Sequence, residues 1–417
     1  MSAEFFNLRH LRVFLEVFEL RSISKASEKV YLSQSAITQA IAKLEDELNT
    51  SLFHRQSEGM FPTESGLLFA SRVRRALSLL LGGLPGVSRF SDGRVIKPSQ
   101  LVQVITSTQL RNLIAISQAQ NFSIASRSLK VSQTSLHSAA RTLESQLGTV
   151  LFEKTSNGIT SSKSALKLAR AAKLAFNEIV QAKEEINAFH NRELGKITVG
   201  SMPLARSSIL PTTIMDFNKD YPNFKISVVD GIYDDLLYHL RNGDIDLLIG
   251  ALRFPGPGED IQQEGLFSSS IEILARADHP LATARTVSLQ TLSTYPWVIL
   301  RHGTPTRTLF DEVFNADDLA MPERIIESGS QGLIRSLLLG GDWLTMSSEH
   351  QFQYELEAGH LKKINFEIVQ TPRKIGITTR KNWNPTETQL AFLGFLRKKA
   401  KALNGSDRAV NEFIKNS

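Results

Sequence analysis

The pattern of apolar and polar positions near the start of the chain predicts three helices and a β-hairpin. Apolar residues recur every three or four positions over about 8–20 and again over 33–48, the spacing of one buried helix face. Ser22, Ser24 and Ser33 are suitable N-caps for the second and third helices. The segment FHRQSEGMFPTESG follows and predicts two short strands that form a wing.

The same pattern returns at an offset of 99 residues. The segment that begins at Leu11 aligns without a gap with the segment that begins at Leu110, and 17 positions are identical over 11–66. The chain therefore carries two copies of one fold, which is a duplication rather than a solenoid.

Each copy continues into a further helix. The first is predicted over about 64–81, and the glycines and proline that follow it predict a linker over 82–99. The second, over about 162–191, is long and apolar along one face. Its length favours pairing with a second subunit, and packing on its own domain is the alternative.

After Gly195, strands alternate with helices. KITVGSM, FKISVVDG and IDLLIGAL are predicted strands with helices between them, which indicates two βαβ units and a parallel sheet. A second set of strands and helices follows, and KIGITTR with a helix over about 386–401 returns to the first lobe. The predicted fold class is α/β: two tandem winged helix-turn-helix domains with linker helices, then a two-lobe α/β domain. The predicted boundaries are 1–81, 82–99, 100–194, 195–403 (lobe I 195–272 and 370–403, lobe II 273–369) and a tail over 404–417.

Composition and charge exclude some kinds of site and indicate a class of partner. The chain of 417 residues is too long for one core, and it has no cysteine, so disulfides and thiolate metal sites are excluded. Without a recognisable export signal or a long apolar run, we expect a cytoplasmic protein with no membrane partner. The first 194 residues carry a net charge of +8 and the remainder −2, so a polyanion is a candidate partner of the first half.

The outer face of the third helix points to double-stranded DNA. A solvated face is the alternative, but Glu and Lys usually dominate such a face and its first two turns contain neither. Short polar side chains on a helix can reach base edges in the major groove. The candidate DNA-binding residues of this helix are Gln34, Ser35, Thr38, Gln39 and Lys43.

Residues 8–66 resemble the DNA-binding domain of LysR-type transcriptional regulators. The resemblance rests on LRHLRVF, SQSAITQAIAKLEDEL, LFHR and PTESG at the family's spacing. It implies that the outward residues of the third helix contact bases and that Arg55 in the wing holds a phosphate. The family often has a second wing arginine where this chain has Glu58, which implies a weaker phosphate contact.

The second copy is more divergent. It is either a second DNA reader or a copy kept for packing, and its higher net charge favours DNA. Its candidate DNA-binding residues are Gln133, Thr134, His137, Arg141 and Lys154.

Segments of residues 195–403 resemble the effector domain of one LysR subgroup, whose members sense sugars or aromatic carboxylates. They are GSMPLARSSILP, IGALRFPGPGEDI, ARADHPLA and PWVILRHGTPTR. Arginines that follow strands can pair with a carboxylate, and hydroxyls at helix starts suit an anion. Helix capping and inter-lobe salt bridges are the alternatives. The candidate effector-binding residues are Ser201, Met202, Pro203, Arg253, Arg301, Thr304 and Ser330.

Three functions compete. The resemblance implies a regulator that binds promoter DNA and a small-molecule effector, forms a homodimer or homotetramer and contacts RNA polymerase. A small-molecule-binding protein without a DNA function is the alternative. An enzyme on the two-lobe fold, such as a porphyrin-pathway deaminase, would need a cysteine to anchor its cofactor. We expect no enzymatic activity, no cofactor and no metal, since the nine histidines lack metal-ligand spacing.

Overall fold

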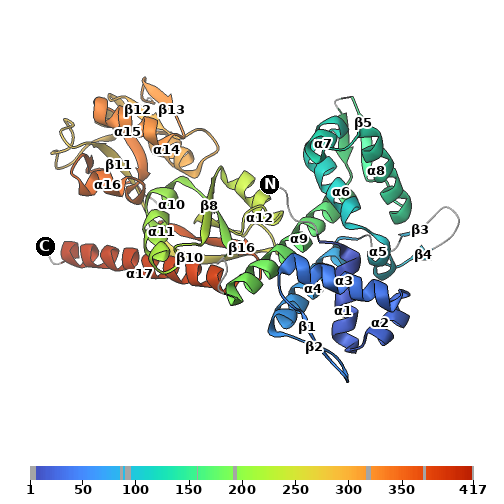
Figure 1. Ribbon diagram of the computed structural model, residues 1–417. Coiled ribbons are helices and arrows are strands. Elements are labelled where there is room, and N and C mark those ends of the chain that lie inside the picture. Colours follow the sequence, from blue (N-terminus) through green and yellow to red (C-terminus); the bar gives the residue numbers. More distant parts are fainter. Residues whose placement is uncertain are drawn as a thin grey trace. The chain divides into compact units, whose positions relative to one another are not determined.

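The computed structural model describes residues 6–84, 88–89, 95–156, 158–190, 195–315, 321–369 and 372–415. The chain forms two compact units (Figure 1). The first unit comprises Met1–Lys196 with Asn223–Lys225 and Arg241–Asp244, and the second comprises the rest. Within the described residues, no helix is both long and apolar enough to cross a membrane.

The first unit contains both predicted winged helix-turn-helix copies. The first copy consists of α1 (Leu8–Leu20), α2 (Ile23–Val30), α3 (Gln34–Leu48), β1 (Phe53–Gln56), β2 (Gly59–Pro62) and α4 (Glu64–Gly83). The second consists of α6 (Ser107–Ala119), α7 (Phe122–Leu129), α8 (Gln133–Leu147), β5 (Phe152–Thr155), β6 (Gly158–Ser161) and α9 (Lys163–Phe189). Ser22 and Ser33 cap α2 and α3, as predicted, because each side chain accepts a free N–H of the first turn.

The segment between the copies differs from the predicted linker. Within 82–99, β3 (Ser88–Arg89) pairs with β4 (Val95–Ile96), and α5 (Pro98–Val104) already begins. Proline at the first helical position and the reciprocal hydrogen bonds of Lys97 and Gln100 explain this start.

The two copies share one hydrophobic core. A single cluster of buried side chains extends from Phe6 to Ile186 through both copies. The guanidinium of Arg12 on α1 donates to the carbonyl of Ile105, at 2.7 Å, and to that of Gln103. The Ser107 hydroxyl at the start of α6 donates to the carbonyl of Phe6, at 2.7 Å. The copies are therefore packed together, and the length of the segment between them does not set their separation.

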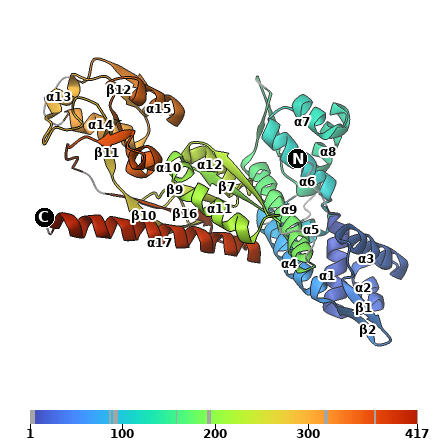
Figure 2. The same ribbon diagram turned by 60° about the vertical axis from the view of Figure 1, so that its left-hand side comes forward.

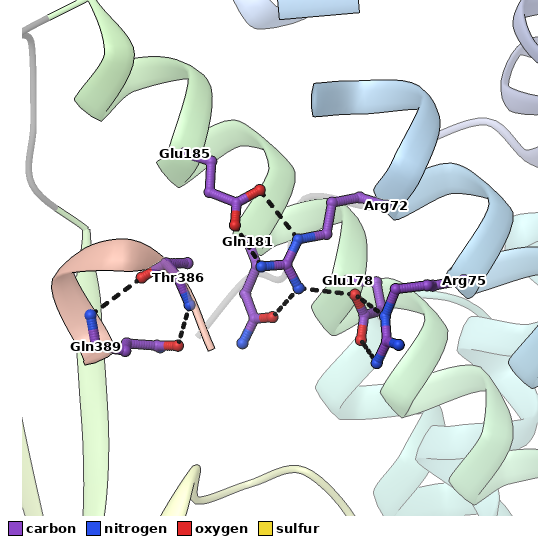
Figure 3. Close-up of polar contacts among 7 residues, drawn as sticks. All are labelled: Arg72, Arg75, Glu178, Gln181, Glu185, Thr386 and Gln389. Atoms are coloured by element: carbon purple, nitrogen blue, oxygen red, sulfur yellow. Dashed lines mark hydrogen bonds and ion pairs between the residues drawn. The ribbon is translucent and has the colours of Figure 1, made fainter. Parts of the chain in front are cut away.

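Helix α4 packs along α9 with a buried arginine between them. Arg72, which is 1% exposed, donates to Glu178 at 2.9 Å, to Gln181 at 2.9 Å and to Glu185 at 3.0 Å (Figure 3). Burial by itself would lower the pKa of Arg72, but the hydrogen bonds that Arg72 donates to Glu185 and Glu178 outweigh it and raise the pKa. The apolar face of α9 is thus covered within its own chain, where the sequence favoured pairing with a second subunit.

The second unit has two lobes. Lobe I contains β7 (Lys196–Ser201), α10 (Pro203–Ser207), α11 (Ile209–Asp220), β8 (Lys225–Asp230), α12 (Tyr233–Arg241), β9 (Leu247–Ala251), β10 (Ile261–Ser269), β16 (Arg373–Arg380) and α17 (Glu387–Lys415). Its strand order is β10-β16-β9-β7-β8. Strands β7 and β9 are parallel, but β16 is antiparallel to both β9 and β10, so the sheet is mixed rather than parallel as predicted.

Lobe II contains β11 (Ile271–Arg276), α13 (Leu289–Ser293), β12 (Trp297–Ile299), α14 (Pro305–Asn315), β13 (Ile325–Glu327), α15 (Gln331–Gly340), β14 (Thr345–Ser348), a 3-10 turn (Glu349–Phe352), α16 (Gln353–Glu357) and β15 (Leu361–Lys363). Its core forms around Trp297, whose ring centroid lies 5.1 Å from that of Phe310 and 5.6 Å from that of Phe314. The chain passes from lobe I to lobe II between β10 and β11, slightly before the predicted boundary at residue 272.

Helix α17 is longer than the sequence predicts. It begins with a capping box, in which the Gln389 amide oxygen accepts from the Thr386 N–H and the Thr386 hydroxyl accepts from the Gln389 N–H (Figure 3). It continues to Lys415, so the predicted separate tail over 404–417 is part of this helix as far as that residue. Phe392 of α17 packs edge-on against Phe217 of α11.

The buried arginine gives a stability prediction with a matched control. Arg72→Ala removes the ion pair of Glu185 and the hydrogen bond of Gln181 and leaves Glu178 paired with Arg75 alone, which should lower the unfolding free energy of the first unit by about 3–5 kcal/mol. Arg74→Ala, on the same helix, removes an exposed ion pair with Glu19 and should cost less than about 1 kcal/mol. Urea unfolding followed by circular dichroism measures both, and equal effects would contradict the role given to Arg72.

Candidate nucleic-acid interface and effector site

Helix α3 has the form that a recognition helix needs. The Ser33 hydroxyl accepts from the Ala36 N–H at 3.2 Å, and Ile37, Ile41 and Leu44 are buried against the core. The predicted base-contacting residues lie on the other side: Gln34, Ser35, Gln39 and Lys43 are exposed and Thr38 is half-buried. The Thr38 hydroxyl donates to the Gln34 carbonyl at 2.9 Å, which leaves its oxygen lone pairs available to accept from a base.

The wing is fixed to the end of α1. Gly59 has a φ of 144°, and a Cβ atom there would lie 2.4 Å from the Arg21 carbonyl oxygen. That carbonyl accepts from the Met60 N–H at 2.9 Å, so the close approach is also a hydrogen bond. Arg55 on β1 and Glu58 in the turn are both exposed.

The wing of the second copy is fixed in the same way. A Cβ on Gly158 would lie 3.0 Å from the Gln120 carbonyl, which accepts from the Ile159 N–H. The carboxylate of Glu144 accepts from the N–H groups of Leu151 and Phe152, and Glu45 does the same for Leu52 and Phe53. Sequence comparison identifies these two glutamates as repeated but does not show that each attaches the wing to its recognition helix.

The outward face of the second copy is polar, but two of its side chains already contact other residues of the chain. Gln133, Thr134, His137, Arg141 and Lys154 are all exposed. The His137 ring stacks on Phe122 with centroids 3.7 Å apart, and Arg141 donates to Glu144 at 3.0 Å. A hollow of about 420 Å³ separates α7, α8 and the wing here.

Three of the predicted effector residues form the junction from β7 to α10 in lobe I, where Ser201 is buried and Met202 and Pro203 are half-buried. Ser201 at the end of β7 is 0% exposed, and its hydroxyl lies 3.3 Å from the Met202 carbonyl oxygen. The Met202 N–H donates to the Ile249 carbonyl, and the Met202 side chain fills the space beside Gly250. Pro203 is the first residue of α10.

The two predicted hydroxyl residues of lobe II cap helices. The Thr304 hydroxyl accepts from the Arg307 N–H at 3.3 Å at the start of α14. The Ser330 hydroxyl accepts from the Leu333 N–H at 3.4 Å at the start of α15. Capping occupies their lone pairs only in part, so either could still bind a ligand.

A pair of arginines in the second unit has no acidic partner. The Arg253 guanidinium lies over the Tyr233 ring, 4.5 Å from its centroid. Arg373 at the start of β16 donates to the Thr306 hydroxyl of α14 at 2.9 Å. Burial lowers the pKa of Arg373, and the nearby charge of Arg253 lowers it further. Among the described residues neither arginine has an ion pair, in contrast to Arg307 beside them, which pairs with Asp311 at 2.7 Å.

The sequence predicts a site role for Arg253 but not for Arg373. Arg373 lies at the start of a strand that returns from lobe II to lobe I, and this position could have identified it as a candidate site residue. Arg301, the other predicted anchor, is exposed after β12, and its side chain makes no ion pair in the part of the chain that the structure describes.

A cavity of about 390 Å³ lies where α10 of lobe I meets lobe II. The Ser207 hydroxyl lies 2.6 Å from the Gln331 amide oxygen, and the Gln331 amide nitrogen donates to the Gln351 carbonyl at 2.6 Å. Arg206, Tyr354 and the ion pair of Arg335 with Glu355 complete its polar lining. None of the seven predicted effector residues lines this cavity. No cluster of possible metal ligands occurs among the described residues.

Comparison with known proteins identifies the parts of the chain. The description "Bacterial regulatory helix-turn-helix protein, lysR family" matches residues 8–67 and again 107–165, and "LysR substrate binding domain" matches residues 190–401. The transcriptional regulator GalR of Pseudomonas putida is 31% identical over 94% of this chain and 96% of its own length. CfxR of Cupriavidus necator is 26% identical over 63% of this chain and 82% of its own.

Solved structures of LysR-type regulators are also similar. CbnR covers 70% of this chain and 98% of its own, at 18% identity and a TM-score of 0.48. CbnR in complex with its target DNA gives 16% identity and a TM-score of 0.48 over 70% of this chain and 99% of its own. From the matched domains and the relative that spans nearly the whole chain, this protein belongs to the LysR family: it is a DNA-binding transcriptional regulator with a duplicated helix-turn-helix and a two-lobe effector domain.

Proposed function

We propose that this regulator responds to a small carboxylate bound between Arg253 and Arg373, and that it reads its operator with α3 and the first wing. The observation that carries the effector proposal is the pair of neighbouring guanidiniums without an acidic partner among the described residues. Two such cations repel each other, and a bound carboxylate would replace the repulsion with charge-assisted hydrogen bonds.

The surroundings of the two arginines suit such a ligand. The Thr306 hydroxyl, which accepts from Arg373, can donate its own proton to a carboxylate oxygen. Thr306 lies in the first turn of α14, where the helix dipole favours an anion. The Arg253 guanidinium stacks on the buried Tyr233 ring, and a planar guanidinium suits the ring of an aromatic acid better than it suits a sugar.

The remaining predicted effector residues have supporting roles in this proposal. Arg301 and Thr304 lie directly before α14, Ser330 caps α15, and Ser201, Met202 and Pro203 form the junction from β7 to α10. Lobe closure on a ligand would act through the Ser207–Gln331 contact, because it joins α10 to α15. The effector then changes operator binding or contact with RNA polymerase.

The DNA proposal rests on the exposed face of α3. Gln34, Ser35, Thr38 and Gln39 contact base edges, while Lys43 and Arg55 hold phosphates. The net charge of the first half supplies the sequence-independent attraction. The protein acts in the cytoplasm as a homodimer or homotetramer and catalyses no reaction.

Replacing Thr38 and Gln39 together by Ala tests the DNA contacts. Sequence preference should fall by about 1–3 kcal/mol for each lost base contact, while affinity for random duplex should stay, because the phosphate-binding residues remain. Asp46→Ala, an exposed change on the same helix, should leave the preference unaltered. Competition binding with specific and random duplexes measures this, and an unchanged preference in the double variant would overturn the assignment.

Replacing Arg253 or Arg373 by Ala tests the effector site. With benzoate and gluconate as probes, we expect wild-type protein to gain melting temperature in benzoate. Each variant should bind benzoate about 10-fold or more weakly, since a hydrogen bond to a charged group contributes about 1.5–3 kcal/mol. Arg285→Ala, at an exposed arginine, is the control. If only Arg301→Ala abolishes the shift, the anchor is Arg301 and the proposed pair is not the site.

A further inference from the structure

The two helices that follow the wings, α4 and α9, occupy equivalent positions in the duplication and pack against each other. Their contacts run in opposite directions along the chain. The Ser65 hydroxyl bonds His190 at 3.0 Å, Arg72 bonds Gln181, and a Cβ on Gly83 would lie 2.2 Å from that of Ala171. As residue numbers rise along α4 they fall along α9, so the helices are antiparallel.

Antiparallel pairing of equivalent helices is the geometry of a two-fold dimer. Exchanging the two copies by the offset of 99 turns the pair Gly83–Ala171 into Arg72–Ala182. The observed contact of Arg72 with Gln181 lies one residue away, so the exchange nearly reproduces the interface. Figures 1 and 2 show the winged parts of the two copies toward opposite ends of this helix pair.

We infer that the duplicated copies form a dimer within one chain, which presents α3 and α8 to two half-sites of a single operator. This inference rests on the proposed reading of DNA by α3. An ordinary dimer gains its second reading helix by association, whereas here the second is covalently attached and its pairing does not depend on concentration.

The hydrogen bonds that fix the second wing indicate that the second copy still binds DNA. Packing alone requires the buried face of α8, but not an attached wing or an outward polar face. Glu144 nevertheless fixes the second wing as Glu45 fixes the first, and Gln133 repeats Gln34 on the exposed side. The second copy also carries the larger positive charge, which favours a duplex.

The two reading helices differ, so the operator has two different half-sites. Thr38 and Gln39 of the first copy correspond to His137 and Ser138 of the second, and Lys43 corresponds to Thr142. The stacked Phe122 holds the His137 ring in one orientation. Identical heads read a palindrome, because operator symmetry mirrors protein symmetry. The heads of one chain instead select a non-palindromic pair of half-sites, which that chain binds in one orientation.

The shared core also fixes the spacing of the half-sites. Arg72 joins the copies through its hydrogen bonds to α9, and Ser107 through its hydrogen bond to Phe6. Arg12 adds hydrogen bonds to Gln103 and Ile105, the described end of the segment that links the copies. Inserting about 5 base pairs between half-sites turns one of them by half a helical turn. A rigid pair cannot follow that rotation, whereas flexibly tethered heads can.

Footprinting of the full-length protein tests the inference. The variant Gln133→Ala/Arg141→Ala should lose protection of one half-site, and Gln34→Ala/Gln39→Ala should lose protection of the other. The half-turn insertion should weaken binding about 10-fold or more. Lengthening the segment after Asp92 by about six Gly and Ser residues should change neither footprint nor spacing preference. Circular dichroism and melting temperature check that each variant is folded.

The outcomes separate the two proposals. If the second-copy variant is folded and protects the same bases as wild type, α8 is only a packing element and the inference fails, while DNA reading by α3 stands. If the longer segment restores binding to the half-turn insertion, the tether sets the spacing and the internal dimer is wrong. If neither head variant changes the footprint, the proposed reading of DNA by α3 fails as well.

Discussion

The first unit depends on one buried charge. Arg72 lies between two helices whose other buried residues are mostly small or apolar, and its hydrogen bonds to Glu178, Gln181 and Glu185 offset the cost of removing it from water. Such a network requires all its members, because a lone buried carboxylate or guanidinium is costly. It therefore selects one register of α4 along α9, and that register places the two copies relative to each other.

The second unit uses arginine in the opposite way. Hydrogen bonds to glutamates outweigh burial at Arg72 and raise its pKa, whereas burial and the charge of Arg253 lower that of Arg373. The first arrangement is electrostatically complete and stabilises the fold. The second lacks an anion, which a ligand can supply. The contrast separates a structural arginine, which is fully buried, from a candidate binding arginine, which is half-buried.

Local sequence patterns predicted much of the fold. Helix α1 begins and ends where the apolar spacing places it, and the caps at Ser22 and Ser33 were readable because capping is a local interaction. The mixed sheet could not be predicted from the sequence, because strand direction depends on the pairing of β16 with β9, and these strands are far apart in the sequence. The α4–α9 pairing was missed for the same reason. Arg373 escaped notice because its neighbour Arg253 is brought to it only by the fold.

The central claim is that one chain places two heads on one duplex, and the absence of cysteine from the sequence allows a direct measurement. Gln56→Cys and Thr155→Cys put a single thiol at equivalent exposed positions of the two wings. An iron chelate attached to either thiol cleaves the DNA beside it. The account predicts that both proteins cleave the operator, each at its own half-site and at a fixed separation. Cleavage from Gln56→Cys alone, with Thr155→Cys bound but silent, would contradict it.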